Sequence, residues 1–290
     1  MKITNKYNLP EPFYKTLASF AGWKPKQGSI GVTTLIAPPL PRMLKMVKWD
    51  EIEVDASEFI PILLGNVAHF VSEANPGDNA LSEEWFSLET EEMKIRARID
   101  RYEKDTKALK DYKVSKIATF YDGVKPEWSL QLNIYAYLIR KAGYEVDSIE
   151  IHGILKDWTA FGVGNNPSYP KLAYQIFPVI LMEDAKIEEY LKNRLSLHKR
   201  AEDLILNEGI EKHWEKFMCS PKERWNTGTT YAVKKKGAKR ATAVFKDEVS
   251  AQRYLEKSGQ GYFVEVRQGV DNNCLYYCNM RRVCEHGKNI

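Results

Sequence analysis

The strongest constraint on the fold is a pair of strand-like segments that each carry one acidic residue. In residues 93–99, apolar side chains alternate with basic ones, as in a strand buried on one face, and Asp100 follows directly. Residues 108–114 form the second segment, in which Asp111 and Lys113 share a face because they are two residues apart. The pattern predicts adjacent strands that bring the two carboxylates together.

Such a pair of carboxylates has a specific chemistry. Two close carboxylates repel each other and raise each other's pKa unless a cation lies between them. Their oxygens are hard ligands that favour Mg²⁺ or Mn²⁺. A metal ion bound there supplies a Lewis acid and an activated water, and the Lys113 ammonium can stabilise the attacking water or the charge of the transition state. Asp100, Asp111 and Lys113 are therefore candidates for phosphodiester hydrolysis.

Residues 59–73 predict a helix that carries further polar side chains. Gly65, His69 and Glu73 follow one another at intervals of four, so they share one face of that helix. We expect Gly65 to allow the close approach of a neighbouring backbone, at a helix-propensity cost of about 1 kcal/mol relative to alanine. His69 and Glu73 are the candidate ligands on this face.

Residues 128–140 predict a second helix, on which Gln131 and Tyr135 are also four apart. Each motif alone has an ordinary structural explanation: Asp-x-Lys is common on solvated strand edges, and a helix histidine is more often satisfied locally than metal-bound. The glutamine and tyrosine could be a surface residue and a core residue. The joint order and spacing, with each motif on the element type it needs, favours a functional site.

This combination resembles the RecB-like branch of the PD-(D/E)XK nuclease superfamily, most closely over residues 60–155. Four family motifs match: a Gly-x-x-x-His helix, an acidic residue that precedes the next strand, Asp-x-Lys, and a Gln-x-x-x-Tyr helix. The matching residues are Gly65 and His69, Asp100, Asp111 to Lys113, and Gln131 and Tyr135.

The resemblance implies a role for each of these residues. Lys113 would be the catalytic lysine, and Gln131 and Tyr135 would position the lysine or the DNA strand. The implied metal ligands are His69, Asp100, Asp111, the backbone carbonyl of Tyr112 and, as a further candidate, Glu73.

We expect an α/β (α+β) fold: a restriction-endonuclease-like core of mixed β-sheet flanked by helices, with a C-terminal cysteine-containing extension. The expected divisions are an N-terminal helix and loop segment at 1–45, broken near Pro38, the nuclease core at 46–208, and the extension at 209–290. Expected strands are 84–88, 92–102, 107–114, 148–155 and 172–178 in the core, and 231–233, 241–245 and 261–267 in the extension. Further helices are expected at 182–207 and 247–257.

The four cysteines are the second informative feature. Cys274, Cys278 and Cys284 form a C-x3-C-x5-C group, and Cys219 precedes them by more than 50 residues. In a reducing compartment, four cysteines suggest metal ligation rather than disulfides. Because some RecB-like nucleases bind a 4Fe–4S cluster through one distant cysteine and a C-terminal trio, the resemblance implies such a cluster. Zn²⁺ on four thiolates is the alternative, and four unligated thiols are the simplest explanation.

A basic stretch in the extension predicts contacts with phosphates. It contains no acid, while the whole chain carries a net charge of only +4. A solvated hairpin would have the same composition. The basic residues are Lys234, Lys235, Lys236, Lys239 and Arg240.

The remaining features bound the function class. A chain of 290 residues can bury a sizeable core, and its longest apolar run is far short of a membrane span. The N-terminal residues do not resemble a signal peptide, so we expect the cytoplasm of a bacterium or of a phage-infected host. No Walker-type motif is present, so a helicase or recombination protein would be a separate partner.

The function we expect is metal-dependent cleavage of DNA, as an exonuclease in recombination, repair or phage DNA processing. An endonuclease or an RNA phosphodiesterase would use the same residues. The competing class is a non-catalytic DNA-binding or assembly module, which would keep the fold and the basic stretch and would lose at least one of His69, Asp100, Asp111 and Lys113.

Overall fold

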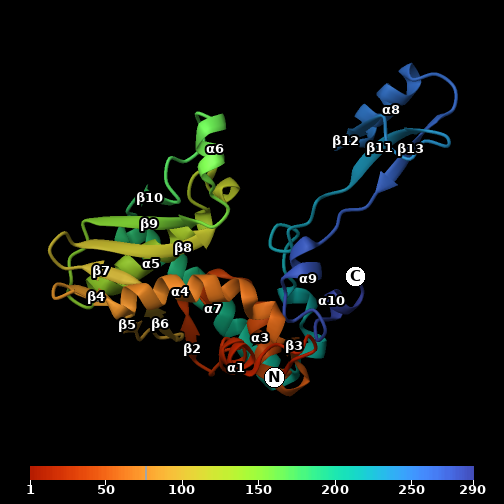
Figure 1. Cartoon of the computed structure of the whole chain (residues 1–290). Helices are drawn as coiled ribbons and strands as arrows, with labels where there is room; N and C mark the ends of the chain where they lie inside the picture. The colour runs from red at the N-terminus through yellow and green to blue at the C-terminus, as the bar shows by residue number, and fades with distance from the viewer. Residues whose placement is uncertain (76) are drawn as a thin grey trace. The chain divides into compact units, whose positions relative to one another are not determined.

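The computed structural model describes residues 1–75 and 77–290, which form two compact units, Met1–Phe217 and Met218–Ile290 (Figure 1). The first unit includes the 3-10 helices Ile210–Lys212 and Glu215–Phe217, which lie beyond the division at residue 208 expected from the sequence. Each unit is described by itself.

The first unit is built on a five-stranded mixed sheet. Its strands, in spatial order, are β10 (Tyr174–Val179), β9 (Ser148–Leu155), β8 (Ala108–Ser115), β7 (Arg101–Glu103) and β4 (Ala80–Ser82). β8 and β9 run parallel, and the other neighbouring pairs are antiparallel. The predicted mixed sheet flanked by helices is confirmed.

A smaller sheet in the same unit has three strands, in the order β2 (Ser29–Gly31), β6 (Lys94–Arg98) and β5 (Trp85–Leu88). The expected single strand 92–102 is therefore two strands in two sheets, with the change at residues 99–100. A third pair, β1 (Lys2–Thr4) and β3 (Glu53–Asp55), is parallel. The alternation of apolar and basic residues correctly predicted β6. It did not indicate that the chain passes from the smaller sheet to the main sheet between β6 and β7.

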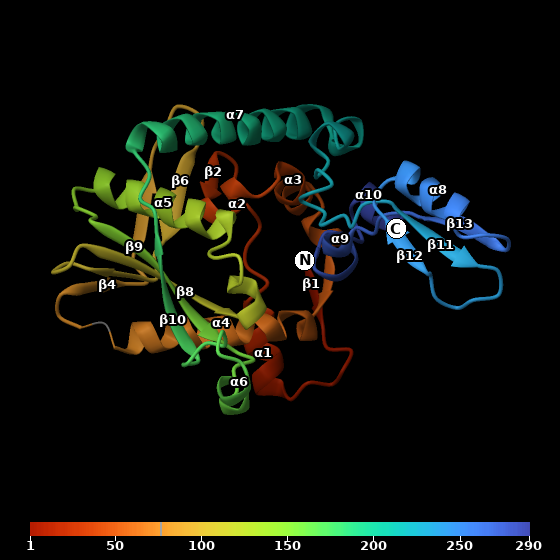
Figure 2. The same cartoon turned by 90° about the horizontal axis from the view of Figure 1, so that it is seen from above.

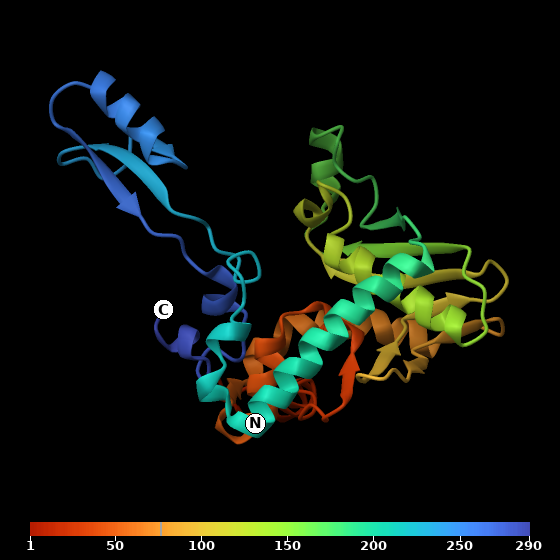
Figure 3. The same ribbon diagram turned by 180° about the vertical axis from the view of Figure 1, so that it is seen from behind.

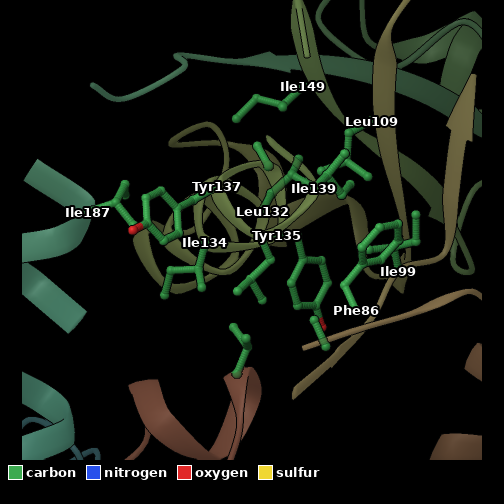
Figure 4. Close-up of a cluster of buried hydrophobic side chains, with 14 of the residues drawn as sticks. Phe86, Ile99, Leu109, Leu132, Ile134, Tyr135, Tyr137, Ile139, Ile149 and Ile187 are labelled. Atoms are coloured by element: carbon green, nitrogen blue, oxygen red, sulfur yellow. The ribbon is translucent and has the colours of Figure 1, made fainter. Parts of the chain in front are cut away.

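One helix is buried on all sides at the centre of the first unit. In α5 (Pro126–Lys141), every residue from Gln131 to Ile139 is buried, because the helix lies between the main sheet and α7 (Asp184–Glu208), as Figure 2 shows. Leu132 and Ile134 of α5 belong to the core drawn in Figure 4. Pro126 and Glu127 start the helix, and Arg140 and Lys141 complement its C-terminal dipole.

The other helices of this unit are short or only partly covered. α2 (Val32–Ile36) and α3 (Pro39–Val47) are separated at Pro38, where the prolines predicted a break. α4 (Ile60–Ala74) contacts β8, and α1 (Glu11–Ser19) precedes β2. The segment between β9 and β10 contains the short helix α6 (Ala160–Asn165), whose first turn is capped by the Thr159 hydroxyl.

A buried ion pair fixes the segment that leads into β2. The Arg42 guanidinium lies 2.5 Å from Glu202, and both side chains are almost fully buried. The same carboxylate accepts the Gly28 N–H at 2.8 Å, and Arg42 donates to the carbonyl of Ser29. Because each buried charge is paired and hydrogen-bonded, this network joins α3 and α7 to the edge of the smaller sheet.

The second unit contains a three-stranded antiparallel sheet in the order β12 (Ala243–Phe245), β11 (Thr230–Lys235) and β13 (Tyr262–Arg267). α8 (Glu248–Lys257) lies along one side of these strands (Figure 3). The Asp247 carboxylate caps α8 by accepting the Ser250 N–H at 2.8 Å. α9 (Asn272–Tyr276) and α10 (Glu285–Lys288) follow the sheet.

Among residues 1–75 and 77–290, no helix combines the length and the apolar character that crossing a membrane requires.

Candidate active site

The structure brings Asp100, which directly precedes β7, next to Asp111 on the paired strand β8. Arg101 pairs with Lys110 across these strands, so the residues that flank each carboxylate are neighbours. One Asp100 oxygen accepts the Tyr112 N–H at 2.7 Å. Both carboxylates are buried, and burial together with the charge of Asp111 raises the pKa of Asp100 to about 7. This is the electrostatic cost expected of two close carboxylates without a cation.

Lys113 lies on the same face of β8 as Asp111. Its Nζ is 2.6 Å from Asp111 Oδ2, and its side chain is only 20% exposed. The same ammonium lies 6.0 Å from the centre of the Trp128 ring on α5. The partial burial holds the positive charge beside the carboxylates instead of in bulk water, which strengthens its interaction with charge that develops there.

His69 reaches the carboxylates from α4. Its Nδ1 lies 2.9 Å from Glu83 Oε1 and 3.5 Å from Asp100 Oδ1. The hydrogen bond to Glu83 is the main cause that raises the pKa of His69, against the opposing effect of burial. Ligand atoms of His69, Glu83 and Asp100 all lie within 4.8 Å of one another. One imidazole nitrogen and two carboxylates make a donor set that suits a divalent cation.

Glu83 is the site residue that sequence reasoning missed. It stands at the bend between β4 and β5, where its φ of +56° is unusual for a residue other than glycine. Its N–H donates to the Asp100 carbonyl at 3.1 Å, and its carboxylate lies 3.0 Å from Arg98 Nε. Nothing in the sequence distinguishes Glu83 from the adjacent Glu84. Only the bend in the folded chain directs the Glu83 side chain toward His69 and Asp100.

Two residues of the α4 motif lie differently from expectation. Glu73 is 61% exposed, lies 3.9 Å from Arg98, and is outside the group formed by His69, Glu83 and Asp100. The predicted close backbone approach at Gly65 is wrong, because a Cβ placed there would meet no atom within 4 Å. α4 is covered only in part, so this turn of the helix borders open space.

Gln131 and Tyr135 lie beside Asp111 on the buried helix α5. The Gln131 amide donates to the Tyr135 hydroxyl at 2.8 Å and makes a longer contact of 3.5 Å to Asp111 Oδ1. Burial, and then the charge of Asp111, raises the pKa of the Tyr135 phenol. The pair therefore supports the carboxylate from behind as neutral hydrogen-bonding groups.

Tyr112 contributes its backbone to this site and its side chain to the other face of β8. Its N–H binds Asp100, while its ring lies 5.5 Å from that of His152. This alternation along the strand is why Asp111 and Lys113 point together toward α5 while Tyr112 points toward α4.

The four cysteines all lie in the second unit. Burial raises the pKa of the Cys219 thiol to about 12 and that of the Cys274 thiol to about 11. The Asn273 N–H donates to the Arg224 carbonyl at 3.0 Å, which closes the long loop between Cys219 and the trio.

A buried carboxylate explains how the distant cysteine reaches the trio. Asp271 lies 2.6 Å from Asn226 Nδ2, 3.0 Å from Arg224 Nε and 2.7 Å from His286 Nε2. Arg224 also donates to the Cys219 carbonyl at 2.8 Å. Asp271 thus joins the segment after Cys219 to the C-terminal helix that follows Cys284.

The basic stretch forms the turn between β11 and β12. Lys235, Lys236, Lys239 and Arg240 are exposed, whereas Lys234 lies on β11 and is 3.3 Å from Glu265. Within residues 1–75 and 77–290, no carboxylate forms an ion pair with those four exposed side chains. The structure leaves most of the positive charge of this stretch available to solvent.

Comparisons with known proteins give partial structural likenesses. No family model and no curated protein sequence matches the chain. The crystal structure of SSO0001 is similar with a TM-score of 0.47 and 18% identity, over 64% of this chain and 85% of that chain. The crystal structure of a phage related exonuclease from Haemophilus somnus 129PT is similar with a TM-score of 0.33 and 19% identity, over 50% of this chain and 70% of that chain.

Proposed function

We propose that this chain is a Mg²⁺- or Mn²⁺-dependent deoxyribonuclease that hydrolyses phosphodiester bonds. One observation carries the proposal: the ligand atoms of His69, Glu83 and Asp100 converge within 4.8 Å, and Asp100 adjoins the ion pair of Asp111 and Lys113. The sequence resemblance adds that the enzyme acts as an exonuclease in recombination, repair or phage DNA processing in the cytoplasm. A separate helicase or recombination protein would open the duplex for it.

The residues present fit a divalent cation. The donor set is one imidazole nitrogen and several carboxylate oxygens, a combination suited to Mn²⁺ and, through the oxygens, to Mg²⁺. Asp100 and Asp111 are both buried, so each carries a desolvation cost that a nearby cation would offset. The ligands we propose are His69, Glu83, Asp100 and Asp111, with the Tyr112 carbonyl as a further oxygen.

The chemistry divides between the metal and this chain's own groups. The metal, when bound, supplies a Lewis acid and lowers the pKa of a water molecule. Lys113 provides a positive charge for the oxygens of the scissile phosphate as negative charge develops on them. Gln131 and Tyr135 hold the Asp111 carboxylate in place, so that it faces Lys113. The open space beside Gly65 gives a DNA strand room to approach His69.

The proposal is tested by incubating the purified protein with labelled single-stranded and double-stranded DNA, with Mg²⁺, with Mn²⁺ and with chelator. We expect cleavage only with a metal. Asp111→Asn should abolish it without unfolding the protein, since the change removes charge and little volume, whereas Asp122→Asn at an exposed loop position should be fully active. Cleavage in chelator, or full activity of Asp111→Asn, would contradict the assignment.

We also propose that Cys219, Cys274, Cys278 and Cys284 bind a 4Fe–4S cluster. All four thiols lie in the second unit, and the contacts of Asp271 join the segment after Cys219 to the helix that follows Cys284. The sequence resemblance favours the cluster, and a single Zn²⁺ on the four thiolates is the alternative.

A further inference from the structure

The sheet of the second unit has one face that α8 does not cover. Residues directly opposite one another in the antiparallel register share a face, so Phe263 lies with Lys234, and Val244 lies with Ala232. Phe245 is on the other face, where its ring packs 5.4 Å from that of Tyr254 on α8. We call the face of Phe263 and Val244 the open face.

The open face exposes apolar side chains. Phe263 is 42% exposed and Val244 is 53% exposed. Ala232, on the central strand between them, is small and fully buried. Glu265 lies opposite Ala232 on the same face, and its carboxylate is paired with Lys234 at 3.3 Å and with Arg267 at 2.6 Å, so two cations balance its charge.

Unneutralised positive charge lies at the same end of the sheet as Phe263. The Lys236 N–H donates to the Gly261 carbonyl at 2.7 Å, which places the basic turn two residues from Phe263 along the strand pair. Gly237, with a φ of +84°, allows the chain to turn there, and the Ala238 N–H closes the turn onto the Lys235 carbonyl. The exposed side chains of Lys236, Lys239 and Arg240 thus lie on the turn next to this end of the open face, whereas Lys235, opposite Tyr262, projects from the other face of the sheet.

We propose that the open face binds single-stranded DNA, with an unpaired base stacked on Phe263 and the flanking phosphates held by the basic turn. An accessible aromatic ring on a sheet, next to basic side chains, is the arrangement that recognises single strands. The positive charge favours a nucleic acid as the occupant, because an apolar protein partner would use Phe263 and Val244 but would not need Lys236, Lys239 and Arg240. A duplex would use the lysines but not the ring, because its bases are stacked on each other.

This inference rests on the proposed function for the choice of DNA, but binding at the open face requires no metal. It can therefore be measured apart from catalysis. The experiment uses the full chain with Lys113→Ala, in chelator, and follows the fluorescence anisotropy of labelled oligothymidylate, a DNA hairpin duplex and oligouridylate.

We expect Phe263→Ala to weaken oligothymidylate binding by between about 5- and 140-fold, the range measured for loss of one stacked base. Binding of the hairpin duplex should change little. Phe263→Trp should restore single-strand binding, because it keeps an aromatic surface. The matched control is Tyr276→Ala, which removes a 72% exposed aromatic ring of the same unit outside the sheet and should have no effect. Thermal melts establish that each variant is folded.

Three outcomes would overturn the proposal: equal binding by Phe263→Ala and its parent, equal weakening of duplex and single strand, or tighter and Phe263-dependent binding of oligouridylate. Failure of the proposed function looks different, because it would leave Phe263-dependent DNA binding intact while the wild-type chain cleaves nothing with Mn²⁺. Conversely, metal-dependent cleavage together with unchanged binding by Phe263→Ala would remove this inference alone.

Discussion

Glu83 and His69 are 14 residues apart in the chain and meet at 2.9 Å between Oε1 and Nδ1. The contact joins α4 to the bend between β4 and β5, and it turns both side chains toward Asp100. A second hydrogen bond, from the Glu83 N–H to the Asp100 carbonyl, fixes the same bend from its backbone. The two residues therefore bring their ligand atoms within 4.8 Å of those of Asp100.

Glu83→Gln should weaken the binding of Mn²⁺ by roughly 10- to 100-fold. This is the loss of metal affinity that typically follows mutation of a group that supports a metal site. The substitution keeps the size of the side chain and removes its charge, so it removes both a ligand and the charged partner of His69. Glu84→Gln is the matched control, since Glu84 is the adjacent residue and its side chain is exposed. Isothermal titration with Mn²⁺ measures both variants, and equal affinity would show that Glu83 only orients the histidine.

The elements that carry the site could be predicted from the sequence because their signals are local. Alternation identified β6 and β8, and spacing of four identified the faces of α4 and α5. The expected pairing of the strand at 93–99 with the strand at 108–114 is wrong, because β6 lies in the smaller sheet and β8 pairs instead with β7, which follows Asp100.

What could not be predicted depends on contacts between distant segments. The change from one sheet to another at Asp100, and the inward turn of Glu83, follow from strand pairing and from a bend with positive φ. Neither has a signature in a single sequence. The predicted close approach of a backbone to Gly65 was wrong for a related reason. Which faces of α4 are covered depends on elements that are distant in the sequence.

Lys113→Ala should lower the rate of DNA cleavage by about 10²- to 10³-fold, as loss of one electrostatic stabiliser typically does. Metal binding should persist, because an ammonium group is not a ligand and its removal leaves Asp111 unpaired. Lys110→Ala is the control: Lys110 lies on the same strand but on the opposite face, 3.0 Å from Glu103. Cleavage kinetics and Mn²⁺ titration on the same samples separate the two roles, and parallel loss of both would make Lys113 structural.

The metal-free protein should lose stability as the pH rises from about 4 to about 7. The folded state raises the pKa of Asp100 from 3.8 to about 7, so it binds a proton more tightly than the unfolded chain does in this window. The raised pKa of His69 acts in the same direction, with stability lost as pH rises above 6.5.

Urea unfolding in chelator between pH 5 and pH 8 measures this dependence. Asp100→Asn, which is neutral at every pH, should flatten the curve and be the more stable form at pH 8. Added Mn²⁺ should stabilise the wild type at pH 8 and not the variant. Parallel curves for the two proteins would show that Asp100 is not the titrating group.

Protein purified without oxygen should be brown and contain about four irons per chain if the cysteines bind a cluster. Cys219→Ala should lose the visible absorbance and destabilise the second unit, because the metal closes a long loop. Asp271→Asn tests the supporting contacts: it keeps the four thiols but weakens the pairing with Arg224 and His286, so the cluster should decay faster on exposure to air. Colourless protein with one zinc would identify the alternative cofactor, and metal-free protein of equal stability would leave four ordinary thiols.

Changing Lys235, Lys236 and Lys239 together to glutamine should weaken DNA binding and flatten its dependence on salt. Removal of each lysine that binds a phosphate should reduce the slope of log affinity against log salt by about 0.7 on single strands and about 0.9 on duplex, because fewer counterions are released. The control changes three other exposed lysines of the second unit, Lys222, Lys246 and Lys257, and so removes the same charge away from the turn. If the turn binds DNA, only the first variant changes the slope between roughly 50 and 200 mM salt. Equal slopes in the two variants would mean that the turn is a solvated hairpin whose charge acts only through the net charge of the chain.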